Sequence, residues 1–112
     1  MSRTRDSVSR QLHMQQVSRR LRVAQTALGA RGKDWAETYG EGESTIANWK
    51  AGDNYPNPWF LTRLCEDTGL TMDFFYRGSL AGVAERLVKP LRQAAATVPG
   101  AFPSLGESPS NT

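Results

Sequence analysis

The sequence predicts an all-α fold, with five helices in the body of the protein and an additional helix toward the C-terminus. The first observation is an amphipathic stripe, in which apolar residues recur at intervals of three and four. It runs through Met14, Val17, Leu21, Ala24 and Leu28. The second is a pair of short helical patterns on either side of Gly40. The third is a series of glycines and capping residues that divide the rest into segments of helix length.

The length and composition of the chain fit one small domain. Its 112 residues, 38 % of them hydrophobic, suffice for a single core. No apolar run approaches the roughly twenty residues that span a bilayer, and no apolar segment follows the N-terminal Ser and Arg residues as a secretion signal would require. We therefore expect a cytoplasmic protein without a membrane segment.

The predicted helices follow in order along the chain. The first begins at Met14 and ends at Gly29, and the second begins near Gly32. The others are predicted over 43–51, from Pro58 to about Thr68, and over 72–77, each ended by a glycine. A sixth helix should reach Lys89, where Pro90 kinks or ends it.

The two ends of the chain differ from its middle in composition. Residues 1–13 are predicted to be a flexible basic arm and 99–112, rich in Pro, Gly and Ser, a disordered tail. Between them lie the 14–80 domain and the 81–98 C-terminal helix. Residues 1–29 hold six Arg and one Asp, a net +5, whereas residues 30–80 hold five basic and eight acidic residues, a net −3.

The middle of the chain resembles the Cro and phage-repressor family, also called the XRE family, in its helix-turn-helix pattern. The positions of the pattern are occupied by Trp35, Ala36, Tyr39, Gly40, Ile46, Trp49 and Gly52. The resemblance extends to Gly78 and implies a lambda-repressor-like helix-turn-helix domain. It also implies a DNA-binding transcriptional regulator that works as a dimer on double-stranded operator DNA.

The helix over 43–51 is the expected reading helix. Ile46 and Trp49 should face inward, which turns polar side chains toward the bases of the major groove. The expected base contacts are Glu43, Ser44, Thr45 and Asn48. The expected contacts to the DNA backbone are Arg31, Lys33, Lys50, Asn54 and Tyr55. In the family the second helix often starts with a Gln that contacts a phosphate; here Gly32 stands at that position, and Lys33 is the nearest substitute.

Further positive charge is expected from the N-terminal segment. Arg3, Arg5, Arg10 and Arg19 are its expected contributors. Arg19, Arg20 and Arg22 fall off the apolar stripe, so they form either a solvated face or a phosphate-binding cluster.

Dimer contacts are expected from the end of the body and from the C-terminal helix. The candidates are Phe74, Tyr76, Leu87 and Leu91. For the two aromatic residues a fully buried role is the alternative. These residues therefore either contact a second subunit or pack in the core of one chain.

The main alternative function keeps the fold and changes the partner. The net negative charge of residues 30–80, with Glu41 and Glu43 at the leading end of the reading helix, suits docking on another regulatory protein. Catalysis is not expected, because the sequence holds no Gly-rich phosphate loop and no clustered metal ligands. His13 has no partner at metal-ligand spacing and Cys65 is expected to be a buried thiol, so we expect no cofactor and no metal.

Overall fold

The computed structural model describes the backbone of residues 2–102 and the side chains of residues 7–102, and this part of the chain is all-helical, without a strand. Its six helices are α1 (Ser2–Leu28), α2 (Gly32–Tyr39), α3 (Glu43–Ala51), α4 (Pro58–Thr68), α5 (Met72–Arg77) and α6 (Glu85–Ala95). No helix in the described range is long and apolar enough to cross a membrane.

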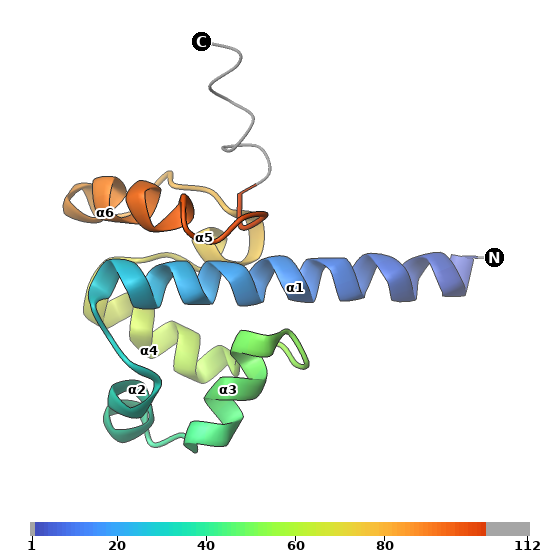
Figure 1. The fold of residues 1–112 in the computed structure, drawn as a ribbon, viewed down its shortest axis with the longest axis horizontal. Coiled ribbons are helices and arrows are strands. Elements are labelled where there is room, and N and C mark those ends of the chain that lie inside the picture. The colour runs from blue at the N-terminus through green and yellow to red at the C-terminus, as the bar shows by residue number, and fades with distance from the viewer. Residues whose placement is uncertain (1, 103–112) are drawn as a thin grey trace, which may run out of the picture.

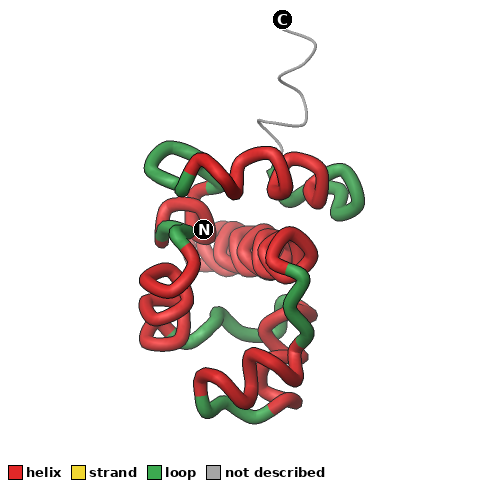
Figure 2. The backbone as a smooth tube through the Cα atoms, turned by 90° about the vertical axis from the view of Figure 1, so that its left-hand side faces the viewer, coloured by secondary structure: helices red, strands yellow, loops and turns green. Residues whose placement is uncertain are grey.

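Helix α1 is the axis of the molecule. In Figure 1 it crosses the middle of the fold, with α5 and α6 on one side and α2, α3 and α4 on the other. Figure 2 shows α1 end-on between these two groups of helices. Its most extensive packing is with α6. The segment 81–98 is therefore part of the same body as the rest of the chain.

Because α1 is covered from two sides, its buried surface is wider than the stripe seen in the sequence. Ser18 and Gln25 are buried on one flank of the Val17–Leu21–Ala24 stripe, and Arg20 and Val23 on the other. The expectation that Arg20 belongs to a solvated or phosphate-binding face is therefore wrong. In the C-terminal half of α1, which packs against the other helices, only a narrow strip remains open to solvent. This strip includes Arg19 and Arg22.

The expected flexible arm over 1–13 is also corrected, because α1 begins at Ser2. Residues 2–13 contain no Gly or Pro, so nothing interrupts a helix that packing has already nucleated further on. This half of α1 extends beyond the other helices in Figure 1. Two apolar residues on it, Val8 and Leu12, are exposed. Residue 1 lies outside the described residues.

The bounds of the four central helices agree with the sequence prediction, because local signals set them. Gly40 and Gly52 end α2 and α3 with φ angles of 71° and 85°, a left-handed conformation that glycine adopts readily. The Asn57 side chain accepts hydrogen bonds from the backbone N–H groups of Trp59 (2.7 Å) and Phe60 (3.3 Å) at the start of α4. Only three residues separate α2 from α3, and the two helices run in clearly different directions in Figure 1.

An aromatic cluster joins α2, α3 and α4. The ring of Phe60 lies 5.5 Å from Trp35, 5.3 Å from Tyr39 and 5.0 Å from Trp49, centroid to centroid. The Tyr39 hydroxyl donates a 2.8 Å hydrogen bond to Asp67 on α4. Burial, together with this bond, raises the pKa of Tyr39 to about 12. The cluster thereby fixes how α3 crosses its two neighbours.

The C-terminal part of the chain contributes to the core, which corrects the expected dimer contacts. Phe74, Leu87 and Leu91 are buried within the single chain and cannot present a contact to a second subunit. They point inward because α5 and α6 pack against α1. Tyr76 is partly buried against the same core. Pro90 lies inside α6 without ending it.

The expected disordered tail over 99–112 is wrong for its first residues. Ala101 and Phe102 are buried, and the Phe102 ring lies 5.5 Å from Phe74. These two apolar residues, which follow Pro99 and Gly100, thus complete the core. The sequence did not predict this because the segment as a whole is rich in Pro, Gly and Ser. The remainder of the expected tail, 103–112, lies outside the described residues.

Candidate nucleic-acid interface

The outer face of α3 is polar and open to solvent. Ile46 and Trp49 are buried as expected, whereas Glu43, Ser44 and Asn48 are exposed. Thr45 is partly exposed. The expected base-contacting side chains therefore share one accessible helix face. Glu43 lies in the first turn, where a carboxylate stabilises the positive end of the helix dipole, and Lys50 lies in the last turn.

The start of α2 is held by a local ion pair. The Arg31 backbone N–H donates to Asp34 at 3.0 Å, and its guanidinium donates to the two carboxylate oxygens at 3.1 and 3.2 Å. Hydrogen bonds from Arg31 lower the pKa of the Asp34 carboxyl. Arg31 is exposed but already paired, so Lys33, which is also exposed, is the freer cation at this helix end.

Two hydrogen-bond donors from other helices lie beside Gly32, the first residue of α2. A Cβ placed on Gly32 would lie 3.9 Å from Lys50 Nζ and 4.0 Å from Gln25 Nε2. Gln25, on α1, is 7 % exposed, and its amide nitrogen has no hydrogen-bond partner in the described part of the chain. A buried donor without a partner in the protein is unfavourable, and such donors are commonly satisfied by an ordered water or by a group of a ligand.

Gln25 was missed by sequence reasoning. The sequence shows only that Gln25 follows Ala24 of the apolar stripe. This position does not indicate which helix the Gln25 side chain contacts. Lys50, by contrast, was expected to contact the DNA backbone, and the structure brings it to the start of α2. The missing side chain of Gly32 leaves the space in which these two donors meet.

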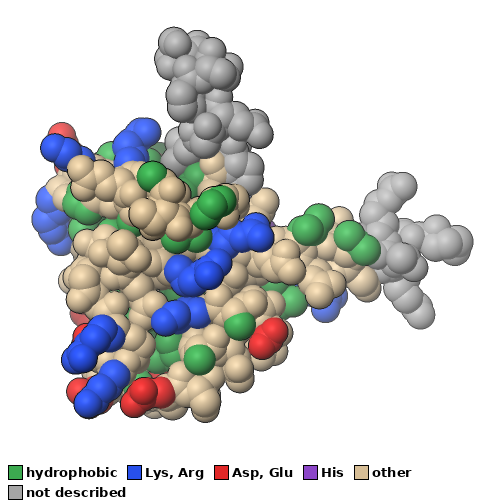
Figure 3. Space-filling view, in the orientation of Figure 1, with side chains coloured by type: hydrophobic (Ala, Val, Ile, Leu, Met, Phe, Trp, Pro, Cys, Tyr) green, Lys and Arg blue, Asp and Glu red, His purple; other side chains and the backbone are tan. Residues whose placement is uncertain are grey.

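Basic residues continue from α2 onto α1. Arg22 is exposed and Arg19 partly exposed on the open strip of α1. Figure 3 shows Lys and Arg side chains gathered over α1 and α2 on the face that also presents α3. Arg10 is exposed further along α1, and the side chains of Arg3 and Arg5 lie outside the described residues. The open strip thus adds positive charge next to α3, with which α1 is in contact.

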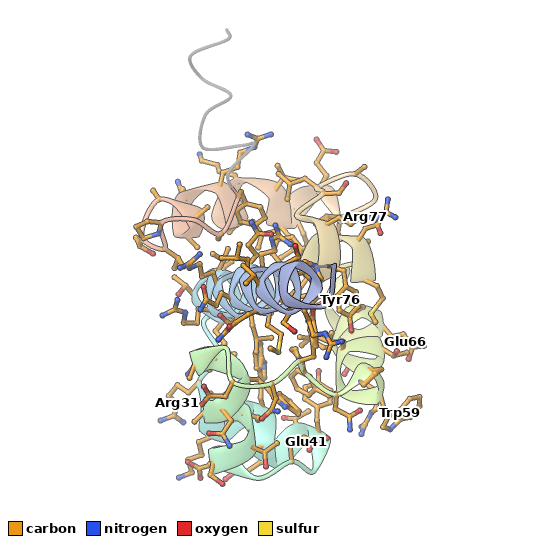
Figure 4. All side chains as sticks on the ribbon, turned by 90° about the vertical axis from the view of Figure 1, so that its right-hand side faces the viewer. Arg31, Glu41, Trp59, Glu66, Tyr76 and Arg77 are labelled. Atoms are coloured by element: carbon orange, nitrogen blue, oxygen red, sulfur yellow. The ribbon has the colours of Figure 1, made fainter. Side chains whose placement is uncertain are left out.

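Part of the negative charge of residues 30–80 lies on the other side of the molecule. In Figure 4, Arg31 lies on the side of α3, whereas Trp59 and Glu66 project from α4 on the opposite side. Asp67 accepts the hydrogen bond from Tyr39, and Asp34 is paired with Arg31. The net negative charge of residues 30–80 is therefore not concentrated on the outer face of α3. Glu43 is the one acidic residue within this helix.

The loop between α3 and α4 borders the same face. Asn54 is exposed and so stays available for the backbone contact expected of it, whereas Tyr55 is partly exposed and its hydroxyl has a partner inside the protein. The Tyr55 hydroxyl lies 2.8 Å from Nδ1 of His13 on α1. A Cβ on Gly52 would lie 3.4 Å from the hydroxyl oxygen of Ser18, so the C-terminal end of α3 also rests on α1.

Little in the described residues suggests catalysis. Burial, with a smaller contribution from Glu66, raises the pKa of Cys65 to about 11, which keeps the thiol protonated at neutral pH. Its sulfur lies 3.9 Å from the sulfur of Met72, and its exposure is intermediate. Within the described range, no group of three His, Cys, Asp or Glu residues lies close enough together to hold a metal ion.

Comparison of this chain with protein-family models, with curated proteins and with solved structures found no match. The features that matter are the polar outer face of α3, the donors beside Gly32 and the basic strip of α1.

Proposed function

We propose that this chain is a sequence-specific DNA-binding transcriptional regulator of the XRE helix-turn-helix type. In this proposal α2 and α3 form the helix-turn-helix, and α3 enters the major groove with its exposed polar face toward the bases. The steep crossing and the three-residue connection of α2 and α3 support it. The segregation of acidic α4 from the side of α3 supports it as well.

The observation that carries the proposal is the Lys50 ammonium beside Gly32, at the positive end of α2 and next to the exposed polar face of α3. Gln25 Nε2 and Lys50 Nζ converge on the first residue of α2, whose backbone N–H groups point out of the helix end. A helix N-terminus with an added ammonium and amide suits a phosphate oxygen. Because α3 lies directly beside this point, a duplex placed against α3 would bring a backbone phosphate to it.

Sequence reading is assigned to α3. Asn48 can bond an adenine through two atoms at once, and the hydroxyls of Ser44 and Thr45 suit several bases. Lys33, Lys50, Asn54 and the arginines of α1 would hold the DNA backbone without reading sequence. Since Phe74, Leu87 and Leu91 are buried, the proposal assigns no dimer contact to them.

We expect Asn48→Ala and Lys50→Ala to weaken DNA binding in different ways. Loss of the Asn48 contact should weaken binding at one base position by about 1–3 kcal/mol, whereas loss of Lys50 should weaken binding to all sequences alike. The measurement is a titration of selected target and random-sequence duplexes at two salt concentrations. If Asn48→Ala weakens specific and non-specific binding equally, the base-contact assignment is wrong.

We expect Gln25→Leu to weaken DNA binding without destabilising the folded protein. Replacing an unpaired buried amide with an apolar side chain of similar size should leave the free energy of unfolding unchanged or raise it, by about 1 kcal/mol. The same change should weaken binding to any duplex, because a phosphate contact is lost. Thermal unfolding and DNA titration of one sample measure both effects.

Thr26→Ala, next to Gln25 but exposed, is the matched control and should change neither quantity. A clear loss of stability in Gln25→Leu would show instead that the amide is paired inside the folded protein. The absence of DNA binding by the unaltered chain, even at low salt, would contradict the proposed function itself.

A second candidate function is docking on another regulatory protein. It is favoured by the exposed Trp59, 64 % accessible, which lies on the same side as Glu66, since exposed tryptophans are common at protein interfaces. Glu41 and Glu43 at the start of α3 add acidic charge. The DNA titration separates the two candidates, because this function needs no affinity for duplex DNA.

A further inference from the structure

A histidine joins α1 to the loop after α3 and to α5. His13 Nε2 lies 2.7 Å from the backbone carbonyl oxygen of Tyr76, and His13 Nδ1 lies 2.8 Å from the hydroxyl of Tyr55. The imidazole also lies against both phenol rings, 5.6 Å from Tyr55 and 6.3 Å from Tyr76 between centroids. Both ring nitrogens of His13 thus contact a hydrogen-bonding partner from another part of the chain.

The partners of His13 determine where its proton lies. A carbonyl oxygen only accepts hydrogen bonds, so Nε2 must carry a hydrogen. In the neutral imidazole Nδ1 is then an acceptor, and the Tyr55 hydroxyl must donate to it. The only hydroxyl hydrogen of Tyr55 is therefore engaged inside the protein. In this state Tyr55 presents lone pairs to its surroundings and cannot donate a hydrogen bond to a phosphate.

Protonation of His13 reverses this bond. In the imidazolium both nitrogens are donors, so Nδ1–H donates to the Tyr55 oxygen and the Tyr55 hydroxyl hydrogen is free to turn outward. A phosphate oxygen can then accept it, while the positive charge of the imidazolium adds attraction. The proton comes from solvent and forms the Nδ1–H bond of the imidazolium, and no other covalent bond of the chain changes.

We propose that His13 is a positioning residue that makes the Tyr55 contact to a DNA phosphate dependent on uptake of one proton. The inference depends on the proposed function, since the phosphate is that of bound DNA. It predicts that DNA binding tightens as pH falls. It also explains why a phosphate-contacting tyrosine is tied to the long helix rather than left free in its loop.

The surroundings of His13 contain no other group that titrates near neutral pH. Tyrosine hydroxyls ordinarily titrate well above neutral pH, and burial raises the pKa of Tyr76. The charged residues that flank the three contacting residues in sequence are exposed, and His13 takes part in no ion pair within the described range. They are Arg10, Asp53, Asp73 and Arg77. The chain holds one histidine, so a pH dependence of binding that His13→Gln removes is attributable to it.

The test measures binding of the full chain to a labelled random-sequence duplex between pH 6 and 8, in the range where histidines titrate. The affinity of the unaltered protein should rise as pH falls, by up to about tenfold per pH unit, the limit for uptake of one proton. His13→Gln, which can donate to the Tyr76 carbonyl and accept from Tyr55, should bind with an affinity independent of pH. Tyr55→Phe should bind like the unaltered protein at pH 8 and gain less affinity as pH falls, because only the charge of the imidazolium then acts on the phosphate.

Circular dichroism melts identify any variant that fails to fold, and the nitrogen shifts of the single imidazole give a second measurement. They should show the Nε2–H tautomer in the free protein at pH 8 and the imidazolium in the complex at lower pH. The same pH dependence in Tyr55→Phe as in the unaltered protein would overturn the inference, as would DNA binding independent of pH. Absence of DNA binding at every pH would overturn the proposed function, and this inference with it.

Discussion

Replacing Phe60 with Ala is expected to remove a large part of the stability of this protein. Phe60 is 1 % exposed and contacts Trp35, Tyr39 and Trp49, so its loss opens a cavity where α2, α3 and α4 meet. A buried Phe→Ala change costs about 3–5 kcal/mol. Small domains have a total stability of about 5–15 kcal/mol, so the variant should be only marginally folded at room temperature.

The neighbouring residue provides the control for this experiment. Trp59 is larger than Phe60 but 64 % exposed, so Trp59→Ala should change the free energy of unfolding by about 0.5 kcal/mol or less. Urea unfolding followed by far-UV circular dichroism measures both variants without relying on the fluorescence of Trp35 and Trp49. Similar losses in the two variants would contradict the placement of Phe60 at the centre of the cluster.

The central helices could be predicted from sequence because their ends depend on local chemistry. Glycine at the end of a helix, and Asn57 or Thr71 at the start, act through backbone conformation and hydrogen bonds a few residues away. The inward orientation of Ile46 and Trp49 follows from helical spacing alone. These signals require no knowledge of the rest of the fold.

The remaining errors concern which face of a helix other elements cover. The apolar stripe of α1 indicates one buried side, but a second layer formed by α5, α6 and residues 101–102 buries Arg20 as well. Leu87 and Leu91 are equally apolar whether they meet α1 or another subunit, and packing decides between the two. Gln25 lies close to the start of α2 although the two are in separate helices, so sequence spacing cannot reveal this proximity.

The residue that joins the second layer to α1 is Arg20, and its replacement is the other change from which we expect a large effect. Arg20 is 4 % exposed; its Nε donates to the Ala101 carbonyl at 2.8 Å and Nη1 to the Phe75 carbonyl at 3.1 Å. Its guanidinium also lies 5.8 Å from the centre of the Phe102 ring. Burial lowers the pKa of Arg20, but a guanidinium remains charged at neutral pH.

Arg20→Met should therefore destabilise the protein although it keeps much of the apolar side-chain volume. Two buried carbonyl oxygens would lose their donors, at about 1–3 kcal/mol each, so we expect a total loss of about 2–6 kcal/mol in urea unfolding. Residues 101–102 should separate from α1 first, which hydrogen exchange of the Ala101 and Phe102 amides can detect. Arg22→Ala, exposed and two residues away, should leave both measurements unchanged. If Arg20→Met is as stable as Arg22→Ala, the second layer is held by apolar contacts alone, and the arginine is not what joins it to α1.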